Sequence, residues 1–423
     1  MSSRSRHIAV IGSGISGIVA AHILQQKHRI TLFEKNDYLG GHTRTVTIPH
    51  GRDQGLAVDT GFIVLNRRTY PNLLRFFRQL DVAVAKTDMA FSYWDRAQDF
   101  YSAGTGWAGL LAQPRNLKNP RFLRLILGIP RFLAQTRKKL LSGALKGLTL
   151  NEYLQREGFS APVIHDFVLP MAAAIWSTPT ARVGDFPAES FARFYDNHGL
   201  LSLIRRPSWY YVRGGSHRYV QAFLKRFTGT VLTGHPVREV RRHADAVTVV
   251  DHNGTAHSFD AVVIAAHADE ALAMLADPSD DERALLSQWQ YNRNRTVLHR
   301  DPSYLPPKSG VWAAWNFLKN TGPQGAQPLT LTYYMNRLQK LPTPTPYCVT
   351  LNPFDSQPVQ EEVAAFDDTH PMYTFEAMET QKNLDKLNGV RRTYFCGAYF
   401  GYGFHEDGVR SALAVARHFG LEL

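Results

Sequence analysis

The sequence has few cysteines and no apolar run long enough to cross a bilayer. Cys348 and Cys396 are the only two cysteines among 423 residues, and neither lies in a CxxC or Cys/His spacing. A disulfide framework and a structural zinc site are therefore unsupported, and the composition suits a reducing compartment. The first apolar run follows "MSSRSRH" and lacks an A-x-A cleavage site, so we do not interpret it as a secretory peptide. We expect a soluble, cytoplasmic protein.

Histidine pairs of the HExxH or HxH kind are also missing, although the sequence has 17 histidines. The run His405-Glu406-Asp407 near the C-terminus is the one place that suggests a metal site at first sight. Three consecutive residues cannot present three ligands to one ion from a helix or strand face. We therefore predict no metal site there.

Acidic residues are absent between Asp99 and Glu152, where lysines and arginines are frequent. In "RFLRLILGIPRFLAQTRKKLL" the basic residues alternate with apolar ones, as in helices that lie on a membrane surface. Segment 115–146 is therefore either a peripheral element on the inner face of the membrane or an ordinary pair of surface helices broken at Pro130. The net charge of +12 favours anionic partners, but no RNP, zinc or helix-turn-helix signature points to nucleic acid.

The N-terminal segment "HIAVIGSGISGIVAAHILQQKHRITLFEK" contains an apolar strand, a GxGxxG motif, a helix and a second strand. Gly12 would make the tight turn, Gly14 would admit a pyrophosphate, and Gly17 would let the helix pack on the strand. Glu34 ends the second strand about twenty residues after the glycines, where an acid accepts hydrogen bonds from the adenosine ribose. This arrangement predicts a dinucleotide-binding fold.

The continuation after Glu34 indicates which dinucleotide binds. Gly40-Gly41, His42 and Arg44 resemble the second glycine pair of the flavin amine oxidase, protoporphyrinogen oxidase and phytoene desaturase superfamily, and "VDTGFIVL" resembles its next strand. In that family the glycine pair lies along the FAD pyrophosphate and ribityl chain. The resemblance therefore implies FAD, with 61–63 near the flavin ring.

Three later segments occur in the order of that family. "YYVRGGSHRYVQAF" resembles the return to the cofactor domain, Val237 stands where the family's backbone meets adenine, and "FDAVVIAAHADEAL" has His267 at a position usually held by proline. The closing "YFCGAYFGYGFHEDGVRSALAVARHFG" resembles the C-terminal FAD motif, with Gly408 expected to start a helix that faces the flavin. Ala398 and Tyr399 stand where the family usually has an acid for the ribityl hydroxyls.

The resemblance implies a set of site residues. The expected FAD-binding residues are Gly12, Ser13, Gly14, Ile15, Ser16, Gly17, Glu34, Lys35, Gly40, Gly41, His42, Thr43, Arg44, Gly61, Phe62, Ile63, Val237, Gly397, Ala398, Asp407, Gly408 and Val409. His405, Glu406 and Tyr399 are the candidate catalytic residues, although the flavin carries the chemistry. For His405 and Glu406 the alternative is a polar residue that only caps the following helix.

The expected fold is α/β. An FAD-binding Rossmann-like domain of the glutathione-reductase type would comprise 1–69, 210–271 and 392–423. An interleaved α+β substrate domain, or cap, would comprise 70–209 and 272–391. Its first block has helical periodicity, and its second has strand-like runs separated by proline-rich loops.

A narrower resemblance concerns the substrate. "VDTGFIVLN", "TYPNL" and "CGAYFGYGFHEDG" are similar to a bacterial group of NAD/FAD-binding oxidoreductases that often occurs with cyclopropane-fatty-acid-synthase-like methyltransferases. This implies a lipid-methyltransferase pathway partner and an apolar lipid substrate such as an unsaturated fatty acyl chain. A basic, apolar cap suits a carboxylate or phosphate head held by arginines. We therefore predict desaturation or double-bond isomerisation by hydride transfer to flavin N5. The alternatives are oxidation of an amine and a non-catalytic flavin- or lipid-binding protein.

Overall fold

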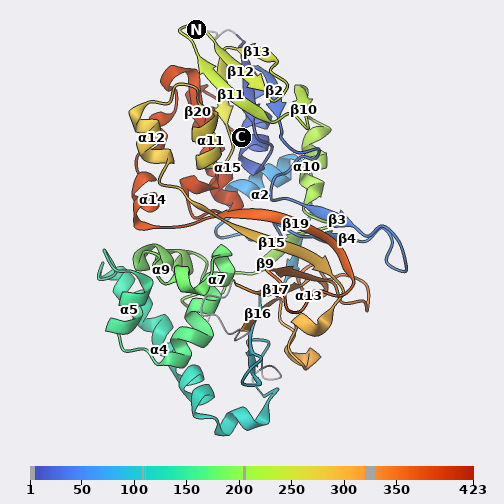
Figure 1. Ribbon diagram of the computed structural model, residues 1–423, viewed down its shortest axis with the longest axis vertical. Helices are drawn as coiled ribbons and strands as arrows, with labels where there is room; N and C mark the ends of the chain where they lie inside the picture. Colours follow the sequence, from blue (N-terminus) through green and yellow to red (C-terminus); the bar gives the residue numbers. More distant parts are fainter. Residues whose placement is uncertain (1–4, 107–108, 110, 203–205, 320–328) are drawn as a thin grey trace.

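The computed structural model describes the whole chain except residues 1–4, 107–108, 110, 203–205 and 320–328 (Figure 1). A five-stranded sheet in the order β10-β2-β1-β14-β20 occupies the end that carries the N-terminus, and all its pairings are parallel. Its strands are β1 (His7–Ile11), β2 (Arg29–Phe33), β10 (Thr230–Leu232), β14 (Ala261–Ile264) and β20 (Thr393–Phe395). Their nearly continuous apolar sequences suit a parallel sheet that is buried on both faces.

Alternate residues of β1 show what covers each face. Ile8 and Val10 pack in the core with α1 and α15, whereas Ala9 and Ile11 pack with a three-stranded sheet. The two helices are α1 (Ile15–Leu24) and α15 (His405–His418), and α10 (His217–Leu224) joins the same core. The small sheet consists of β11 (Val237–Arg242), β12 (Val247–Asp251) and β13 (Ala256–Phe259), with Gly254 at a φ of +83° in the turn between β12 and β13. This arrangement confirms the predicted α/β fold.

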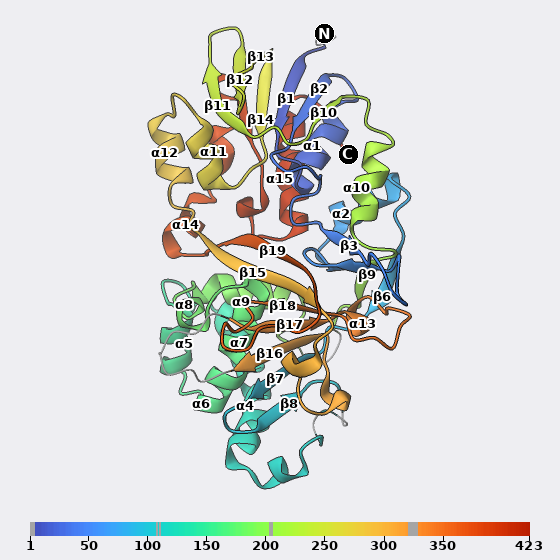
Figure 2. The same cartoon turned by 45° about the vertical axis from the view of Figure 1, so that its right-hand side comes forward.

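The sheet β5-β9-β6 lies beside this half of the molecule (Figure 2). It comprises β5 (Val64–Asn66), β9 (Trp209–Val212) and β6 (Val84–Thr87), and α2 (Pro71–Gln79) leads from β5 toward β6. Leu73, Phe76 and Phe77 of α2 enter the hydrophobic core that α1 and α15 share. The division into two domains stays a prediction, but α2 and β6 pack on the cofactor side of the expected boundary at residue 70.

A seven-stranded sheet in the order β19-β15-β18-β17-β16-β7-β8 forms the centre of the second half. Its strands are β19 (Glu362–Pro371), β15 (Tyr291–His299), β18 (Cys348–Leu351), β17 (Leu331–Tyr334), β16 (Trp315–Lys319), β7 (Phe91–Asp95) and β8 (Phe100–Ala103). The long antiparallel pair β15/β19 crosses the molecule between the two halves (Figures 1 and 2).

Helices form the end of the molecule opposite the N-terminus (Figure 1). They are α4 (Pro120–Leu141), α5 (Leu150–Arg156), α6 (Ala161–Val163), α7 (Leu169–Trp176), α8 (Thr180–Val183) and α9 (Ala188–Asn197). The remaining elements are β3 (Thr45–Thr47), β4 (Ala57–Asp59), α11 (Ala268–Met274), α12 (Asp280–Leu286), α13 (Met335–Leu338) and α14 (Phe375–Thr380).

A helix pair broken at Pro130, one of the two alternatives for segment 115–146, is wrong, because Pro130 lies inside the single helix α4. A proline in a helix interior removes one backbone hydrogen bond. Phe122 and Leu125 on one side of it and Phe132 and Leu133 on the other are buried in the same core. This shared packing holds both halves of the helix in line. Within the described residues, α4 and every other helix fall short of the length and apolar character that a membrane span requires.

Candidate cofactor and active site

The first glycine motif forms the turn from β1 into α1, and each glycine has a separate steric reason. Gly12 has a φ of +98°, and a Cβ added there would lie 2.6 Å from the carbonyl oxygen of Ala265. A Cβ on Gly17 would collide with the carbonyl oxygen of Gly12. A Cβ on Gly14, in contrast, would meet no atom within 4 Å, and no side chain caps α1 there. The start of α1 therefore has no side-chain cap and has open space beside Gly14, as a phosphate site requires.

Glu34 lies at the end of β2, beside this turn, and is 5% exposed. Its carboxylate accepts hydrogen bonds from Ser13 N at 3.0 Å, from Ser13 Oγ at 2.5 Å and from the backbone and side chain of Asn36 at 2.9 Å each. His235 N donates to the Glu34 carbonyl at 2.9 Å, which brings the segment before Val237 alongside. The predicted adenosine-side residues therefore lie together. Lys35 instead points to the surface, where it pairs with Glu270 at 2.6 Å.

The second glycine pair folds back onto the first motif. Gly40 and Gly41 have φ values of +125° and +58°, and Gly40 N donates to the Ser13 carbonyl at 3.1 Å. A Cβ on Gly41 would lie 3.1 Å from Gly14 Cα. The two motifs, at 12–17 and 40–41, are more than twenty residues apart in sequence but form one continuous backbone surface, which we call the glycine wall. Such close backbone approach is the usual reason for glycine at these positions.

Helix α15 approaches the same wall from the other end of the chain. It begins at His405, so the prediction that Gly408 starts the helix is wrong. A Cβ on Gly408 would lie 2.8 Å from both Ile15 Cγ2 and Ser16 Oγ, so this glycine allows α15 to cross the start of α1 closely. Val409 is fully buried in the shared core and packs rather than facing the site.

Residues 40–44, which we call the cofactor loop, lie next to the start of α15. His405 is the polar side chain that α15 presents to this loop. Its ring stacks on Phe62 with centroids 3.7 Å apart and 16° between planes. Nε2 lies 2.9 Å from Thr43 Oγ1, which in turn lies 2.7 Å from the Tyr219 hydroxyl. Burial, together with the neighbouring His42, lowers the pKa of His405 to about 3. The imidazole is therefore neutral at pH 7 and serves as a hydrogen-bond partner.

Glu406 points away from this contact and caps α2. Its carboxylate accepts hydrogen bonds from Asn72 N at 3.1 Å, from Asn72 Nδ2 at 2.6 Å and from Leu73 N at 2.9 Å. These donors belong to the first turn of α2, which has no intrahelical acceptors. Glu406 therefore joins two helices, and its carboxylate is directed away from the His405–Phe62 pair.

Asp407 holds the loop at 397–404, which precedes α15 and which we call the closing loop. It accepts hydrogen bonds from Tyr402 N at 2.9 Å and Phe404 N at 3.1 Å, and it lies so close to Gly401 that a Cβ there would overlap it. Burial raises the pKa of Asp407 to about 6. The side chains of His405, Glu406 and Asp407 thus point in three directions, toward the cofactor loop, α2 and the closing loop.

A group of three histidines lies where the cofactor loop meets the β15/β19 pair. His42 is 2.9 Å from the Thr369 carbonyl through Nε2, and its ring lies 5.4 Å from His370 and 5.9 Å from His267. His267 stacks on Tyr291 at 4.3 Å. Burial lowers the pKa of His267 to about 4 and that of His370 to about 3.

Arg44 makes a second contact across the same junction. Its guanidinium lies over Phe366 at 4.0 Å and pairs with Asp368 at 3.2 Å. Asp368 also accepts a hydrogen bond from Thr296 Oγ1 at 2.8 Å, and the neighbouring His42 and Arg44 lower its pKa against the opposing effect of burial. The predicted cofactor residue Arg44 is therefore also a link between the halves.

Several of these side chains keep accessible surface although they are deeply placed. His405, His267 and His370 are only half-buried by exposed area, yet burial is the main cause of their lowered pKa values. Their surroundings therefore disfavour a charged imidazole even though part of each ring stays accessible. Phe62 and Phe404 show the same partial exposure.

The remaining predicted residues are buried in the core or packed against backbone. Tyr399 is 2% exposed, its ring packs 5.6 Å from Trp289, and its hydroxyl has no partner among the described residues. It covers Gly397, whose N–H donates to Ser411 Oγ at 2.9 Å. Ala398 begins a short 3₁₀ turn, Ile63 is buried in a separate core cluster, and Gly61 lies against the His42 carbonyl.

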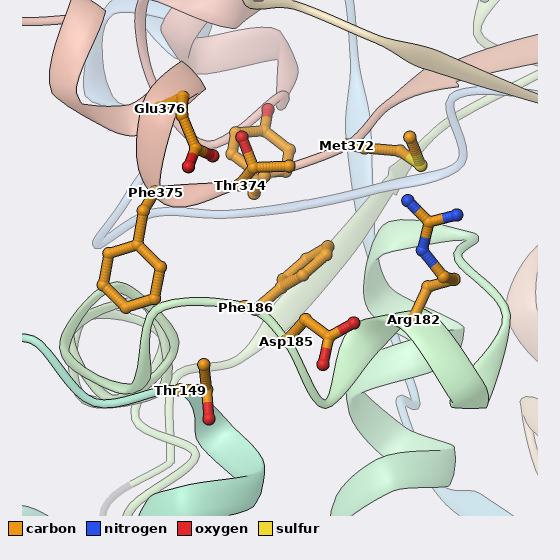
Figure 3. A pocket seen from close by; sticks show the side chains of 9 residues that line it. Thr149, Arg182, Asp185, Phe186, Met372, Thr374, Phe375 and Glu376 are labelled. Carbon is orange, nitrogen blue, oxygen red and sulfur yellow. The ribbon is translucent and has the colours of Figure 1, made fainter.

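A pocket of about 320 Å³ opens between the helical end and the segment after β19 (Figure 3). Thr149, Arg182, Asp185 and Phe186 line one side, and residues 372–376 line the other, with Phe186 projecting between them. The hydroxyl of Tyr373 in that segment touches Gly403 of the closing loop. One tyrosine ring thus separates the pocket from the loop before His405.

Sequence reasoning missed the long-range partners of this site. Tyr219, which bonds Thr43, and Asp59, which accepts hydrogen bonds from Thr45 Oγ1, Ser216 N and Gln339 Nε2, were not among the expected residues. Burial raises the pKa of Asp59 to about 6. Both lie within the quoted segments "VDTGFIVL" and "YYVRGGSHRYVQAF", so the motifs marked the right regions without identifying the contacts.

The chain belongs to the family of flavin-containing amine oxidoreductases, whose model matches residues 15–418. Its cofactor is therefore FAD, and the open Gly14 turn, the uncapped start of α1 and the position of Glu34 fit an adenine dinucleotide.

Known proteins share this fold. A putrescine oxidase triple mutant aligns over 98% of both chains with a TM-score of 0.71 and 14% identity, and a fatty acid isomerase from P. acnes over 99% of both with 0.68 and 16%. Cyclohexylamine oxidase from Brevibacterium oxydans covers 98% of this chain and 100% of its own, with a TM-score of 0.67 and 15% identity. An L-amino-acid oxidase from Siganus canaliculatus is 24% identical over 296 residues, 65% of this chain, which spans about half (52%) of that relative's length.

Proposed function

We propose that the protein is an FAD-dependent oxidoreductase that desaturates or isomerises an unsaturated fatty-acyl or other apolar lipid substrate. Bound flavin supplies a hydride acceptor at N5. The chain's own residues would hold the substrate's anionic head, exclude water and keep the reacting part of the chain among uncharged side chains. The feature that carries this proposal is an arginine-lined depression that adjoins a row of stacked aromatic rings.

The depression has a volume of about 290 Å³ and is lined by Arg67, Arg68, Pro207, Ser208 and Tyr210. The Arg67 guanidinium lies 5.0 Å from the centre of the Tyr210 ring. Neither arginine has an acidic partner within the described residues. Stacking on an aromatic face leaves the edge of a guanidinium free to bind a carboxylate or phosphate through two hydrogen bonds. The site therefore suits an anion and disfavours an ammonium group.

The aromatic row leads from this depression toward the cofactor loop. The ring centroids of Trp209 and His198 are 6.1 Å apart, those of His198 and Phe194 are 3.9 Å apart, and those of Phe194 and Phe404 are 4.8 Å apart. Burial, with help from Arg68, lowers the pKa of His198 to about 4, so the row is uncharged at pH 7. Phe404 directly precedes His405. Phe194 is 3% and His198 7% exposed, so an acyl chain would contact the half-buried rings of Trp209 and Phe404 at the two ends of the row.

Oxidation of an amine is the second candidate. The family, the amine oxidases of similar fold and the L-amino-acid oxidase relative support it. Asp368, Glu406 and Asp407, on β19 and at the start of α15, are each engaged by an arginine or by backbone N–H groups. An ammonium substrate would therefore have to compete with these arginine and N–H donors for the carboxylates. This competition favours a lipid over an amine as the substrate.

The test is anaerobic mixing of the FAD-loaded enzyme with linoleate and, separately, with putrescine, cyclohexylamine and an L-amino acid. Flavin absorbance and the double-bond positions of recovered lipid would be measured. We expect lipid turnover, seen as bleaching or as a shifted double bond. Bleaching by an amine alone would overturn the proposal, and no response to any compound would leave a non-catalytic flavin- or lipid-binding protein as the better description.

The arginine site gives a sharper version of this experiment. Arg67→Gln and Arg68→Gln should each raise the linoleate concentration for half-maximal response by about tenfold, because one charge-assisted hydrogen-bonding group is lost. The response to methyl linoleate, which has no charge, should not change. Arg75→Gln, an exposed arginine on α2, is the matched control. Equal effects on acid and ester would contradict a role for the arginines in binding the head group.

A further inference from the structure

Helix α4 has a second apolar face, which is exposed. Leu123 is 44% exposed, and Leu127 and Leu141 are each 76% exposed. Pro130 and Ala134 are exposed too, and the spacing of these five residues places them on one side of the helix. We call them the leucine stripe. Leu111 and Leu117 lie just before α4, so five of the eight large apolar side chains exposed in the described chain fall between residues 111 and 141.

Basic side chains border the leucine stripe. Lys118, Arg124, Lys138 and Lys146 are exposed and have no ion-pair partner in the part of the chain that the structure describes. Other basic residues of the region are neutralised: Arg121 pairs with Asp95 and Asp166, Arg137 with Asp196, and Lys139 with Glu157. The unpaired charge is thus concentrated beside the exposed leucines.

We propose that the leucine stripe and its basic border dock the protein on an anionic lipid surface. Helix α4 would lie in the plane of the headgroups, with Leu123, Leu127 and Leu141 below them and Arg124 and Lys138 at the level of the phosphates. An amphipathic helix with a basic border binds membranes in this way. Exposed apolar patches of this kind mark interaction sites rather than ordinary surface.

Charge argues for lipid against a second copy of the chain. A symmetric dimer through α4 would bring two unpaired basic faces together, whereas an anionic bilayer supplies opposite charge and an apolar phase at once. The position of α4 agrees with this partner. It lies at the end opposite the N-terminus and the five-stranded sheet (Figures 1 and 2), so docking would leave the cofactor sheet in water.

The test is flotation of the full-length, FAD-loaded protein with phosphatidylcholine vesicles that contain or lack phosphatidylglycerol. We expect binding to the anionic vesicles alone and its loss at high salt, because screening weakens the charge contribution. Arg124→Gln and Lys138→Gln should each weaken binding by about fivefold, and Leu127→Gln should weaken it at least as much. Leu224→Gln and Lys225→Gln, adjacent exposed residues at the end of α10, are the matched controls.

Insertion can be measured separately from attraction. Both native cysteines are buried, so Leu127→Cys can carry a single polarity-sensitive fluorophore, with Leu224→Cys as the control position. Emission should shift to the blue at position 127 only. Equal vesicle binding by all variants, no vesicle binding, or dimers in light scattering that depend on Leu127 would each overturn the proposal. None of these measurements depends on substrate turnover, so failure of the proposed function would leave this result intact.

Discussion

The cofactor half and the helical end of the molecule are specified in different ways. Around the glycine wall, backbone passes so close to backbone that a single added carbon at Gly12, Gly17 or Gly408 would meet another atom at or below normal contact distance. Around α4, in contrast, large apolar side chains stand in solvent and the helix continues through a proline. Close backbone contact allows only glycine at these positions, whereas an exposed helix surface accepts many residue types. The cofactor site can therefore be recognised from the sequence, whereas the substrate cannot.

The largest expected effect comes from filling the tightest glycine. Gly17→Ala places a Cβ on the carbonyl oxygen of Gly12, and we expect it to cost more than about 4 kcal/mol of unfolding free energy or to prevent folding. Urea denaturation followed by circular dichroism would measure this loss. Gly14→Ala is the control, because its Cβ meets open space: it should fold normally but bind FAD at least about tenfold more weakly. Equal stability losses would contradict the assigned geometry.

The next effect concerns pH. Burial raises the pKa of Asp407 to about 6 from an ordinary value near 3.8, so the folded state binds this proton more tightly than the unfolded state. The stabilisation is then fully present below about pH 4 and is lost as pH rises to about 6. The unfolding free energy of the wild type relative to Asp407→Asn should fall by up to about 3 kcal/mol over that window.

Urea titrations of both proteins at pH 4, 5, 6 and 7 would follow the difference. A flat difference would show that the Asp407 carboxyl is not desolvated in the closing loop. Asp59, whose pKa burial also raises to about 6, provides an internal comparison through Asp59→Asn.

A smaller loss is expected at the junction of α15 and α2. Glu406→Ala removes the acceptor for three N–H groups at the start of α2 and should cost about 1–2 kcal/mol, as other helix caps do. Glu406→Gln should recover part of this stability. If Glu406 instead carries a proton for the reaction, Glu406→Gln would be as inactive as Glu406→Ala while remaining stable, and turnover of the two variants decides the matter.

The smallest effect should come from the leucine stripe. Leu127→Gln removes a side chain that is 76% exposed and should change the unfolding free energy by less than about 0.5 kcal/mol. Leu125→Ala, two residues earlier and 3% exposed, should cost about 2–5 kcal/mol. Thermal denaturation of the two variants would compare the faces of one helix. A large loss at Leu127 would mean that this face is covered within the chain.

Local patterns predicted what local contacts determine. The βαβ unit, Glu34 and the two glycine motifs each depend on residues close in sequence, and the structure brings them together. The predicted start of α15 at Gly408 is three residues late, because the small size of Gly408 serves the crossing with α1 and does not mark a helix boundary. The capping role of Glu406 is not predictable from local sequence, because its partner, the first turn of α2, lies more than 330 residues away.

The long β15/β19 pair has a mechanical consequence. At one end its residues Asp368, Thr369 and His370 contact Arg44 and His42 of the cofactor loop, and over the rest of its length it belongs to the seven-stranded sheet of the other half. A hinge motion that swung the cap open as one body would have to break these contacts. Ligand exchange would then depend on side chains rather than on movement of the whole cap, and Tyr373 and Phe186, whose rings lie 6.0 Å apart, line the pocket of Figure 3. The two halves would keep their relative position while only side chains at the pocket move.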